Sequence, residues 1–184
     1  MTDRRELGGA CAAFVGGEKV VDLWGGARDA RDGSPWEEDT LVLVYSTSKG
    51  LAAMTLALAH SRGWLDYEER VTTYWPEFGQ AGKDRVTVRQ LLGHEAGLPV
   101  IDAPLDPRVL ADFDRLGEAI ERQRPVWEPG SRHGYHGVSL GWYMGELVRR
   151  VDPAKRTLGR FFAEEIAAPL GCPWTVLSPS GART

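Results

Sequence analysis

Two residues in the stretch 42–60, VLVYSTSKGLAAMTLALAH, could carry out acyl transfer together. Ser46 and Lys49 are three residues apart, so on a helix they share one face and can touch. The N-terminus of such a helix carries a partial positive charge that stabilises an alkoxide or an oxyanion. An ammonium packed among apolar neighbours loses hydration and releases its proton more readily, and a neutral lysine can accept a proton from serine. The pair therefore predicts a nucleophilic serine beside its base.

The same pair also has a purely structural interpretation. Ser46 would then be an ordinary N-cap residue, and Lys49 would extend its ammonium from the first helical turn into water. A serine and a lysine at this spacing occur together by chance often enough that the spacing alone is weak evidence. The surrounding sequence has to decide between the two interpretations.

A second candidate nucleophile lies in residues 137–141, GVSLG, which satisfy the GxSxG pattern of a nucleophile elbow. That elbow needs a buried strand directly before Ser139 and a catalytic histidine later in the chain. Ser139 instead follows a loop rich in glycine and histidine, and all histidines precede it: His60, His94, His133 and His136. The sequence argues against an elbow here.

His133 and His136 also raise the question of a metal site. They are three residues apart in a glycine-rich loop, and no third ligand lies near them in the sequence. This arrangement is weaker than two histidines on one helical face. The sequence favours histidines that are solvated, or that support Tyr135, over metal ligands.

The elements that must position Ser46 and Lys49 begin with a β-hairpin. Apolar runs at 11–15 and 20–24 flank residues 16–19, GGEK, which is typical of a hairpin. The continuous apolar character predicts a sheet that is covered on both faces. A helix is predicted from near Ser46 to Gly63.

Four shorter helices follow in the prediction. One has Val88, Leu91 and Leu92 inward and ends at Gly93, and one spans 106–123 with Asp106 as N-cap and Pro107 at its first position. Two more are indicated by apolar periodicity at 139–151 and 158–166. The segment 125–137 reads as a long loop, so Tyr135 lies just before a helix.

Three segments of the chain, in this order, resemble one family. YSTSKG after a hairpin ending in VVDLWGG resembles the SxxK motif of the serine β-lactamase and penicillin-recognising superfamily, especially its class C and serine esterase branch. VTVRQLLGHEAGLP is similar to the LLxHxxGL segment of that branch, and EPGSRHGYHGVSLGWYMGELVRRV resembles the segment that bears its second motif. The resemblance extends from about residue 9 to 171. It implies an α/β fold of the β-lactamase/transpeptidase type, an α+β sandwich with an N-terminal hairpin and a helical region.

The resemblance also implies roles for individual residues. Ser46 would be the acylated nucleophile, Lys49 its proton acceptor or electrostatic activator, and Tyr135 a phenolate or proton shuttle near Lys49. Tyrosine, with an ordinary pKa of about 10, needs a nearby cation to ionise at neutral pH. His94 and Gly97 match the linking segment, where a structural role is expected. The implied reaction uses a small-molecule ester or amide, with no cofactor and no metal.

The sequence departs from the family pattern in two places. Many relatives have asparagine where this chain has Gly137, and the loss of that amide favours esters over β-lactams and peptide amides. The third motif and the C-terminal strands of the sheet are expected beyond residue 184, and the resemblance ends after Gly171. We therefore expect a single, incomplete domain over 1–184, from a truncated or frame-altered product. The alternative is a non-catalytic remnant or a self-associating interaction module of the same fold.

Composition narrows the remaining function classes. The chain has 184 residues, 42% hydrophobic and 26% charged, with a net charge of −4, which is typical of a soluble globular protein. Basic residues are spread without a block, so no nucleic-acid partner is predicted. No secretory signal or membrane-spanning run is apparent, which predicts a cytoplasmic location. Cys11 and Cys172 are then expected to be buried thiols rather than a disulfide.

Overall fold

The computed structural model describes residues 6–104, 106, 109 and 112–172. Contacts along the chain divide it into two compact units, Met1–Val44 and Tyr45–Thr184. All three residues proposed for chemistry from the sequence belong to the second unit. The single domain across 1–184 stays a prediction.

The first unit contains the predicted hairpin. Strands β1 (Gly8–Val15) and β2 (Glu18–Gly26) pair antiparallel, with a register shift between Ala13 and Phe14. Gly16 and Gly17 form the loop with φ of 59° and 87°, and two successive positive φ values are what a type I′ turn requires. The loop is thus two residues shorter than predicted.

The predicted burial of both faces of the hairpin is wrong for the described residues. β1 and β2 form a two-stranded sheet, and Phe14 and Leu23 are 64% and 66% exposed. Cys11 is free and exposed on β1, so its predicted burial is also wrong, while Cys172 is free and half-buried. Two strands alone cannot cover both of their own faces, which is the physical reason for the difference.

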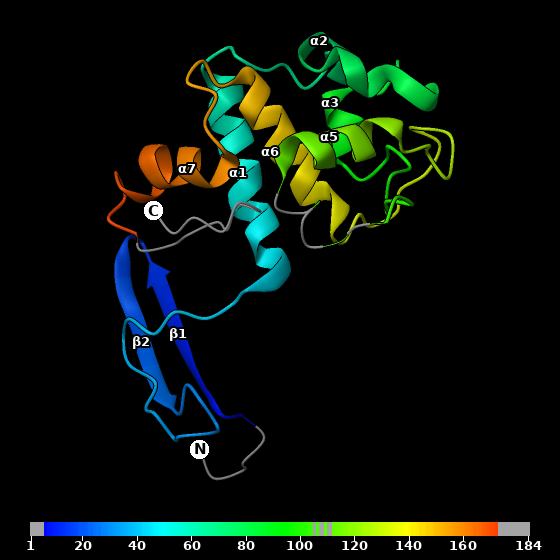
Figure 1. The fold of residues 1–184 in the computed structure, drawn as a ribbon. Helices are drawn as coiled ribbons and strands as arrows, with labels where there is room; N and C mark the ends of the chain where they lie inside the picture. Colours follow the sequence, from blue (N-terminus) through cyan, green and yellow to red (C-terminus); the bar gives the residue numbers. More distant parts are fainter. Residues whose placement is uncertain (1–5, 105, 107–108, 110–111, 173–184) are drawn as a thin grey trace. The chain divides into compact units, whose positions relative to one another are not determined.

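The second unit is helical (Figure 1). Its elements, in chain order, are η1 (Tyr45–Thr47), α1 (Ser48–Ser61), α2 (Val71–Tyr74), η2 (Pro76–Gly82), α3 (Val88–Leu92), α5 (Phe113–Arg122), α6 (Ser139–Val151), α7 (Leu158–Phe162) and the π-helical turn η3 (Ala163–Ala167). The predicted helices at 88–92, 139–151 and 158–166 are therefore confirmed, and the helix predicted from near Ser46 to Gly63 is present as α1, two residues shorter at each end. No helix among the described residues is long and apolar enough to cross a bilayer.

Helix α1 carries the central part of the core. Its buried residues Ala52, Thr55, Leu56 and Ala59 recur at helical spacing, and they form one inward stripe. The helix ends where Gly63 adopts φ 71°, as its sequence predicts. α1 packs against α6 and α7, as Figure 1 shows. The helix that follows Ser46 is thereby held against two other helices of the unit.

The helix predicted over 106–123 is not one continuous helix, because Val109 is helical while Asp112 is not. α5 starts at Phe113, and Asp112 caps it by accepting hydrogen bonds from the backbone N–H groups of Asp114 and Arg115. Asp106 instead accepts from the backbone N–H of Val109. Pro107 lies outside the described residues. Both aspartates therefore accept from the N–H group three residues later, which is the contact of an N-cap residue, and Asp112 is the one that caps α5.

Helix α6 and the aromatic residues around it fill the rest of the core. Tyr143 on α6 lies 6.4 Å from Trp75 and 6.0 Å from Phe78, measured between ring centroids. These three side chains are fully buried. Burial of large aromatic rings contributes strongly to stability, so this cluster fixes α6 against α2 and η2.

Lys83 is a fully buried cation that the sequence did not single out. Its Nζ donates to the backbone carbonyls of Gln80, Glu121 and Gln123 at 2.9, 2.7 and 2.6 Å. Burial lowers the pKa of this ammonium to about 8. The three hydrogen bonds join the end of η2 to the end of α5 and give the buried ammonium three acceptors.

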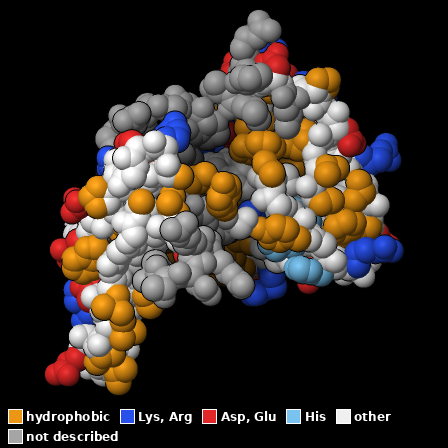
Figure 2. All heavy atoms as spheres, turned by 90° about the horizontal axis from the view of Figure 1, so that it is seen from below, with side chains coloured by type: hydrophobic (Ala, Val, Ile, Leu, Met, Phe, Trp, Pro, Cys, Tyr) orange, Lys and Arg blue, Asp and Glu red, His pale blue; other side chains and the backbone are white. Residues whose placement is uncertain are grey.

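Hydrophobic side chains also reach the surface, over much of the face shown in Figure 2. In the second unit, the large exposed ones include Tyr45 at 78%, Val138 at 70% and Leu170 at 71%. Tyr45 directly precedes Ser46, the predicted nucleophile. Exposed apolar side chains next to a reactive group are typical of a substrate-binding surface.

Candidate active site

Ser46 lies in the single turn η1, directly before α1 begins at Ser48. This differs from the prediction that Ser46 occupies the first turn of the helix. Its neighbour Tyr45 has φ 44°, a left-handed conformation that is unfavourable for a tyrosine. Strained backbone of this kind is concentrated at functional sites, because the surrounding structure has to enforce it.

Lys49 lies one turn after Ser46 and points back to it. Its Nζ is 3.2 Å from Ser46 Oγ, as the i, i+3 spacing predicts. The Lys49 side chain is half-buried. The complete burial among apolar neighbours that would favour a neutral amine is therefore not observed, and the geometry has to identify the base in another way.

Tyr135 completes the group, although it is 89 residues from Ser46 in the sequence. Its Oη donates a hydrogen bond of 2.6 Å to Ser46 Oγ. Lys49 Nζ lies 5.0 Å from the centroid of the Tyr135 ring. The structure thus brings together all three residues that the sequence singled out for catalysis.

A backbone carbonyl that the sequence did not indicate also belongs to the site. Lys49 Nζ donates a short hydrogen bond to the carbonyl oxygen of Gly137. Any residue can offer this carbonyl, so no residue type could have signalled it. Nζ donates to this carbonyl and also contacts Ser46 Oγ, so the Gly137 carbonyl helps to hold the Lys49 side chain beside the serine.

The electrostatics of the site act mainly on Tyr135. The hydrogen bond with Ser46, followed by that with Lys49 and the charge of Lys49, holds the pKa of the Tyr135 phenol below its ordinary value. Tyr135 is 56% exposed, so water screens these effects in part. A phenol with a lowered pKa beside a serine hydroxyl can act as its general base.

The Tyr135 loop is held by the linking segment 94–98. Backbone N–H groups of Val126, Gly130 and Gly134 donate to the carbonyls of Gly97, Glu95 and His94 at 2.8, 3.0 and 3.0 Å. Gly97 has φ 75°, and a Cβ there would lie 2.6 Å from the Trp127 carbonyl oxygen. These contacts agree with the structural role expected for this segment.

Gly134 is the tightest point in this loop. A Cβ at Gly134 would lie 2.4 Å from Trp127 Cη2. We therefore expect Gly134→Ala to lower the free energy of unfolding by about 1–3 kcal/mol, because the indole or the backbone before Tyr135 has to move. Urea unfolding measures this loss.

Gly141→Ala is the matched control for Gly134→Ala. Nothing lies within 4 Å of a Cβ at Gly141, on the exposed side of α6. Alanine there is expected to raise stability by about 0.5–1 kcal/mol, since glycine is the poorer helix former. Equal effects of the two substitutions would contradict the proposed steric constraint at Gly134.

The other candidates from the sequence take structural positions. Ser139 Oγ is buried and donates to the carbonyl of Leu98 at 2.7 Å, so it is not presented to a substrate. His136 is fully buried, with both ring nitrogens in hydrogen bonds to Gly134 and Leu98. Within the described residues, no group of three or more His, Cys, Asp and Glu side chains is arranged to hold a metal ion.

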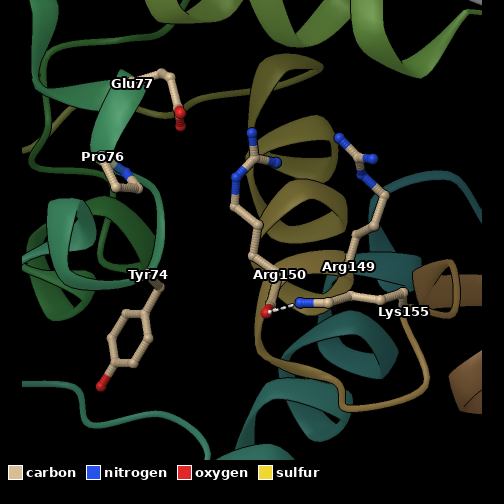
Figure 3. Close-up of a pocket in the computed structure, with 6 residues that line it drawn as sticks. All are labelled: Tyr74, Pro76, Glu77, Arg149, Arg150 and Lys155. Atoms are coloured by element: carbon tan, nitrogen blue, oxygen red, sulfur yellow. Dashed lines mark hydrogen bonds between the residues drawn. The ribbon is translucent and has the colours of Figure 1, made fainter.

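A separate hollow of about 410 Å³ lies between α2, η2 and the C-terminal end of α6 (Figure 3). It is lined by Tyr74, Pro76, Glu77, Arg149, Arg150 and Lys155. Arg149 and Arg150 already pair with the buried Glu146, and Lys155 Nζ donates to the Arg150 carbonyl. The cations in this hollow are thus engaged within the protein, and Ser46, Lys49 and Tyr135 do not line it.

Comparison with known proteins identifies the class to which this site belongs. The Beta-lactamase family matches residues 1–183. The chain therefore belongs to the β-lactamase family of serine hydrolases, which includes esterases and β-lactamases. The predicted family is confirmed.

Individual relatives support the same assignment. The chain is 36% identical over 171 residues to the esterase/β-lactamase LipL of Mycobacterium tuberculosis (strain ATCC 25618 / H37Rv), covering 91% of this chain and 38% of LipL. A family VIII carboxylesterase of known structure is 44% identical to this chain, with a TM-score of 0.85. The match covers 90% of this chain and 45% of the carboxylesterase chain. A penicillin-binding protein homolog from Caulobacter crescentus is 42% identical with a TM-score of 0.85, covering 92% and 45%.

These structural matches confirm the predicted β-lactamase/transpeptidase-like fold. The N-terminal hairpin and the helices of this chain correspond to about 45% of each solved chain. The chain thus spans less than half the length of these relatives.

Proposed function

We propose that this chain carries the catalytic residues of a serine esterase, with Ser46 as the nucleophile that becomes acylated. The observation that carries this proposal is the position of Ser46 Oγ, which lies 3.2 Å from Lys49 Nζ and 2.6 Å from Tyr135 Oη. A hydroxyl within hydrogen-bond distance of a potential base and a cation is the arrangement that serine acyl transfer requires.

In the acylation step, Tyr135 acts as the base and Lys49 as the cation that keeps its phenolate form accessible. Ser46 Oγ attacks the ester carbonyl carbon and transfers its proton to Tyr135 Oη, while the carbonyl electron pair moves onto oxygen. The partial positive charge at the N-terminus of α1 stabilises this oxyanion. The carbon–oxygen bond to the alcohol then breaks, and the departing alkoxide takes the proton from Tyr135.

Deacylation reverses these roles with water in place of the alcohol. Tyr135 removes a proton from water, and the resulting hydroxide attacks the acyl carbon. The bond between the acyl carbon and Ser46 Oγ breaks, Ser46 regains the proton, and the carboxylic acid leaves. Each step needs only Ser46, Lys49, Tyr135 and water, so the proposed reaction uses no cofactor.

Two observations favour esters over amides as the substrate class. Gly137 offers only its backbone, and its carbonyl is occupied by Lys49 Nζ. An amide substrate has a poorer leaving group and therefore depends more on extra hydrogen bonds in the transition state. The relatives of this chain also include a carboxylesterase and LipL, which is described as an esterase/β-lactamase.

The test compares p-nitrophenyl butyrate hydrolysis with labelling by a fluorescent penicillin, using the purified chain after circular dichroism has verified folding. The proposal expects ester turnover and slower penicillin labelling. A folded sample that does neither would overturn it and would favour a non-catalytic remnant or a self-associating module.

Replacing Gly137 with asparagine tests the substrate preference. A Cβ at Gly137 would lie 3.5 Å from Tyr135 Cε1, an ordinary van der Waals contact. The family resemblance places a carbonyl-binding amide at this position, and one added hydrogen bond is expected to speed penicillin labelling about five- to tenfold. A Gly137→Asn variant that gains only in ester turnover would contradict this account of the preference.

A further inference from the structure

Two histidines outside the proposed proton-transfer group hold the residues on either side of Tyr135. His94 accepts twice: its carbonyl oxygen receives the backbone N–H of Gly134 at 3.0 Å, and its Nδ1 receives the backbone N–H of His136 at 2.9 Å. Tyr135 lies between these two donors. Its backbone position is therefore set largely by His94.

His136 is held in turn by both of its ring nitrogens. Nδ1 lies 2.6 Å from the Gly134 carbonyl, and Nε2 accepts the backbone N–H of Leu98 at 2.8 Å. A carbonyl can only accept and a backbone N–H can only donate, so these partners define the proton position. His136 must carry one proton, on Nδ1, and must be neutral.

The same reasoning fixes the state of His94. Its Nδ1 accepts from the His136 backbone N–H, so that nitrogen has no proton, and a neutral His94 carries its proton on Nε2. The two rings are 5.3 Å apart between centroids. Protonation of either ring places an N–H against a backbone N–H and breaks that hydrogen bond.

We propose that His94 and His136 form a pair of neutral imidazoles that positions Tyr135 against Ser46, and that protonation of either ring releases the Tyr135 segment. The pair consists of positioning residues, since neither ring contacts Ser46 Oγ within the described hydrogen bonds. The expected loss of ester hydrolysis in acid rests on the proposed function. The expected release of the Tyr135 segment in acid is independent of it.

The surroundings of the pair work against protonation. Burial, followed by the neighbouring His136, His133 and Lys49, holds the pKa of His94 below its ordinary value. Burial also lowers the pKa of His136, the Gly134 carbonyl opposes this effect, and His133 adds to it. The titratable Tyr135 ring faces His94 as well, at 5.1 Å between centroids.

The direction of the pH dependence follows from these lowered values. The unfolded chain takes up protons on these rings at an ordinary pKa near 6.5, before the folded chain does. The stabilisation from the pair is therefore complete above about pH 6.5 and is lost as the pH falls through the folded-state pKa values. Ester hydrolysis is expected to show this loss in acid in addition to the loss caused by protonation of the Tyr135 phenolate.

The test is an NMR titration of the ¹⁵N-labelled chain, which needs no substrate. At neutral pH the imidazole spectrum is expected to show the Nδ1–H tautomer for His136 and the Nε2–H tautomer for His94. Amide exchange protection at Leu98 reports the state of His136, and protection at His136 reports the state of His94. Both are expected to fall about tenfold as the pH drops below 6.5, since loss of one hydrogen bond corresponds to roughly that factor.

His94→Asn separates the two rings. The asparagine carbonyl can accept from the His136 backbone N–H, cannot titrate, and tolerates the φ of 64° found at His94. This variant should keep amide protection at His136 in acid while Leu98 still loses it. His60→Asn, a substitution near the far end of α1, is the matched control and should leave both responses as in the parent chain.

Several outcomes would overturn the proposal: the opposite tautomer on either ring, a doubly protonated ring at neutral pH, or amide protection that does not change with pH. If the NMR results hold while the folded chain shows no ester turnover, the proposed function fails and the structural inference stands. If turnover is present but shows no additional loss over the pH range in which Leu98 and His136 lose protection, the positioning role is wrong.

Discussion

Replacing Ser46 with alanine lowers the rate of ester hydrolysis by about 10⁴–10⁶-fold, because the proposed acyl-enzyme forms on the oxygen of this residue. Stability should change by less than about 0.5 kcal/mol, since Ser46 is exposed and its hydroxyl contacts only the side chains of Lys49 and Tyr135 within the described hydrogen bonds. Initial rates with p-nitrophenyl butyrate and urea unfolding measure the two effects separately.

Ser48→Ala is the matched control for this loss. Ser48 is two residues further along, begins α1 and is half-buried. The Ser48→Ala variant shows whether loss of a serine near the start of α1 is enough to reduce activity. Retention of most of the activity by Ser48→Ala is expected, and retention of a substantial rate by Ser46→Ala would contradict the proposed nucleophile.

Replacing Lys49 with methionine is expected to lower the rate about 10³-fold or more, which is within the range that one strong electrostatic group contributes to catalysis. The substitution removes the cation beside Tyr135 and the hydrogen bond to the Gly137 carbonyl. Because the charge and hydrogen bond of Lys49 contribute to the lowered pKa of Tyr135, its removal raises that pKa. The rising limb of the pH–rate profile should therefore move to higher pH.

Lys49→Arg tests which role of Lys49 matters. Arginine keeps the positive charge but does not release a proton at accessible pH. If Lys49 acts as the cation beside a Tyr135 base, Lys49→Arg should retain more activity than Lys49→Met. Equal losses, with no movement of the pH profile, would instead indicate that Lys49 itself takes the serine proton.

Local signals in the sequence predicted the elements around the site well. Gly63 and Gly93 follow α1 and α3 directly or after one residue, and the apolar spacing in residues 139–151 matches α6. These signals depend on conformational preferences within one turn of helix. They need no knowledge of the rest of the chain.

The incorrect predictions concern features for which the local sequence allows more than one structure. Asp106 and Asp112 are both acceptable N-cap residues, and only the folded backbone shows that Asp112 caps α5. The apolar strands of the hairpin predict cover on both faces, yet the described residues leave Phe14 and Leu23 exposed. Burial depends on which other segments are present.

The sequence predicted the side chains of the site but not the hydrogen bonds that hold them in place. Ser46 and Lys49 follow from spacing, and Tyr135 came from the family resemblance, since no spacing rule connects residues this far apart. The Gly137 carbonyl and the two histidines beside Tyr135 act through backbone hydrogen bonds. Such contacts leave little trace in residue type, which is why the sequence suggested only that the histidines support Tyr135.

Covalent labelling with a fluorophosphonate tests the central claim most directly. The reagent loses fluoride and leaves a phosphonyl group on an activated serine oxygen, and trypsin then releases residues 32–49 as one peptide that contains Ser46. The account predicts a single adduct that fragmentation places on Ser46, with much slower labelling in Lys49→Met. Labelling at Ser139, or at Ser46 with an undiminished rate in Lys49→Met, would contradict it.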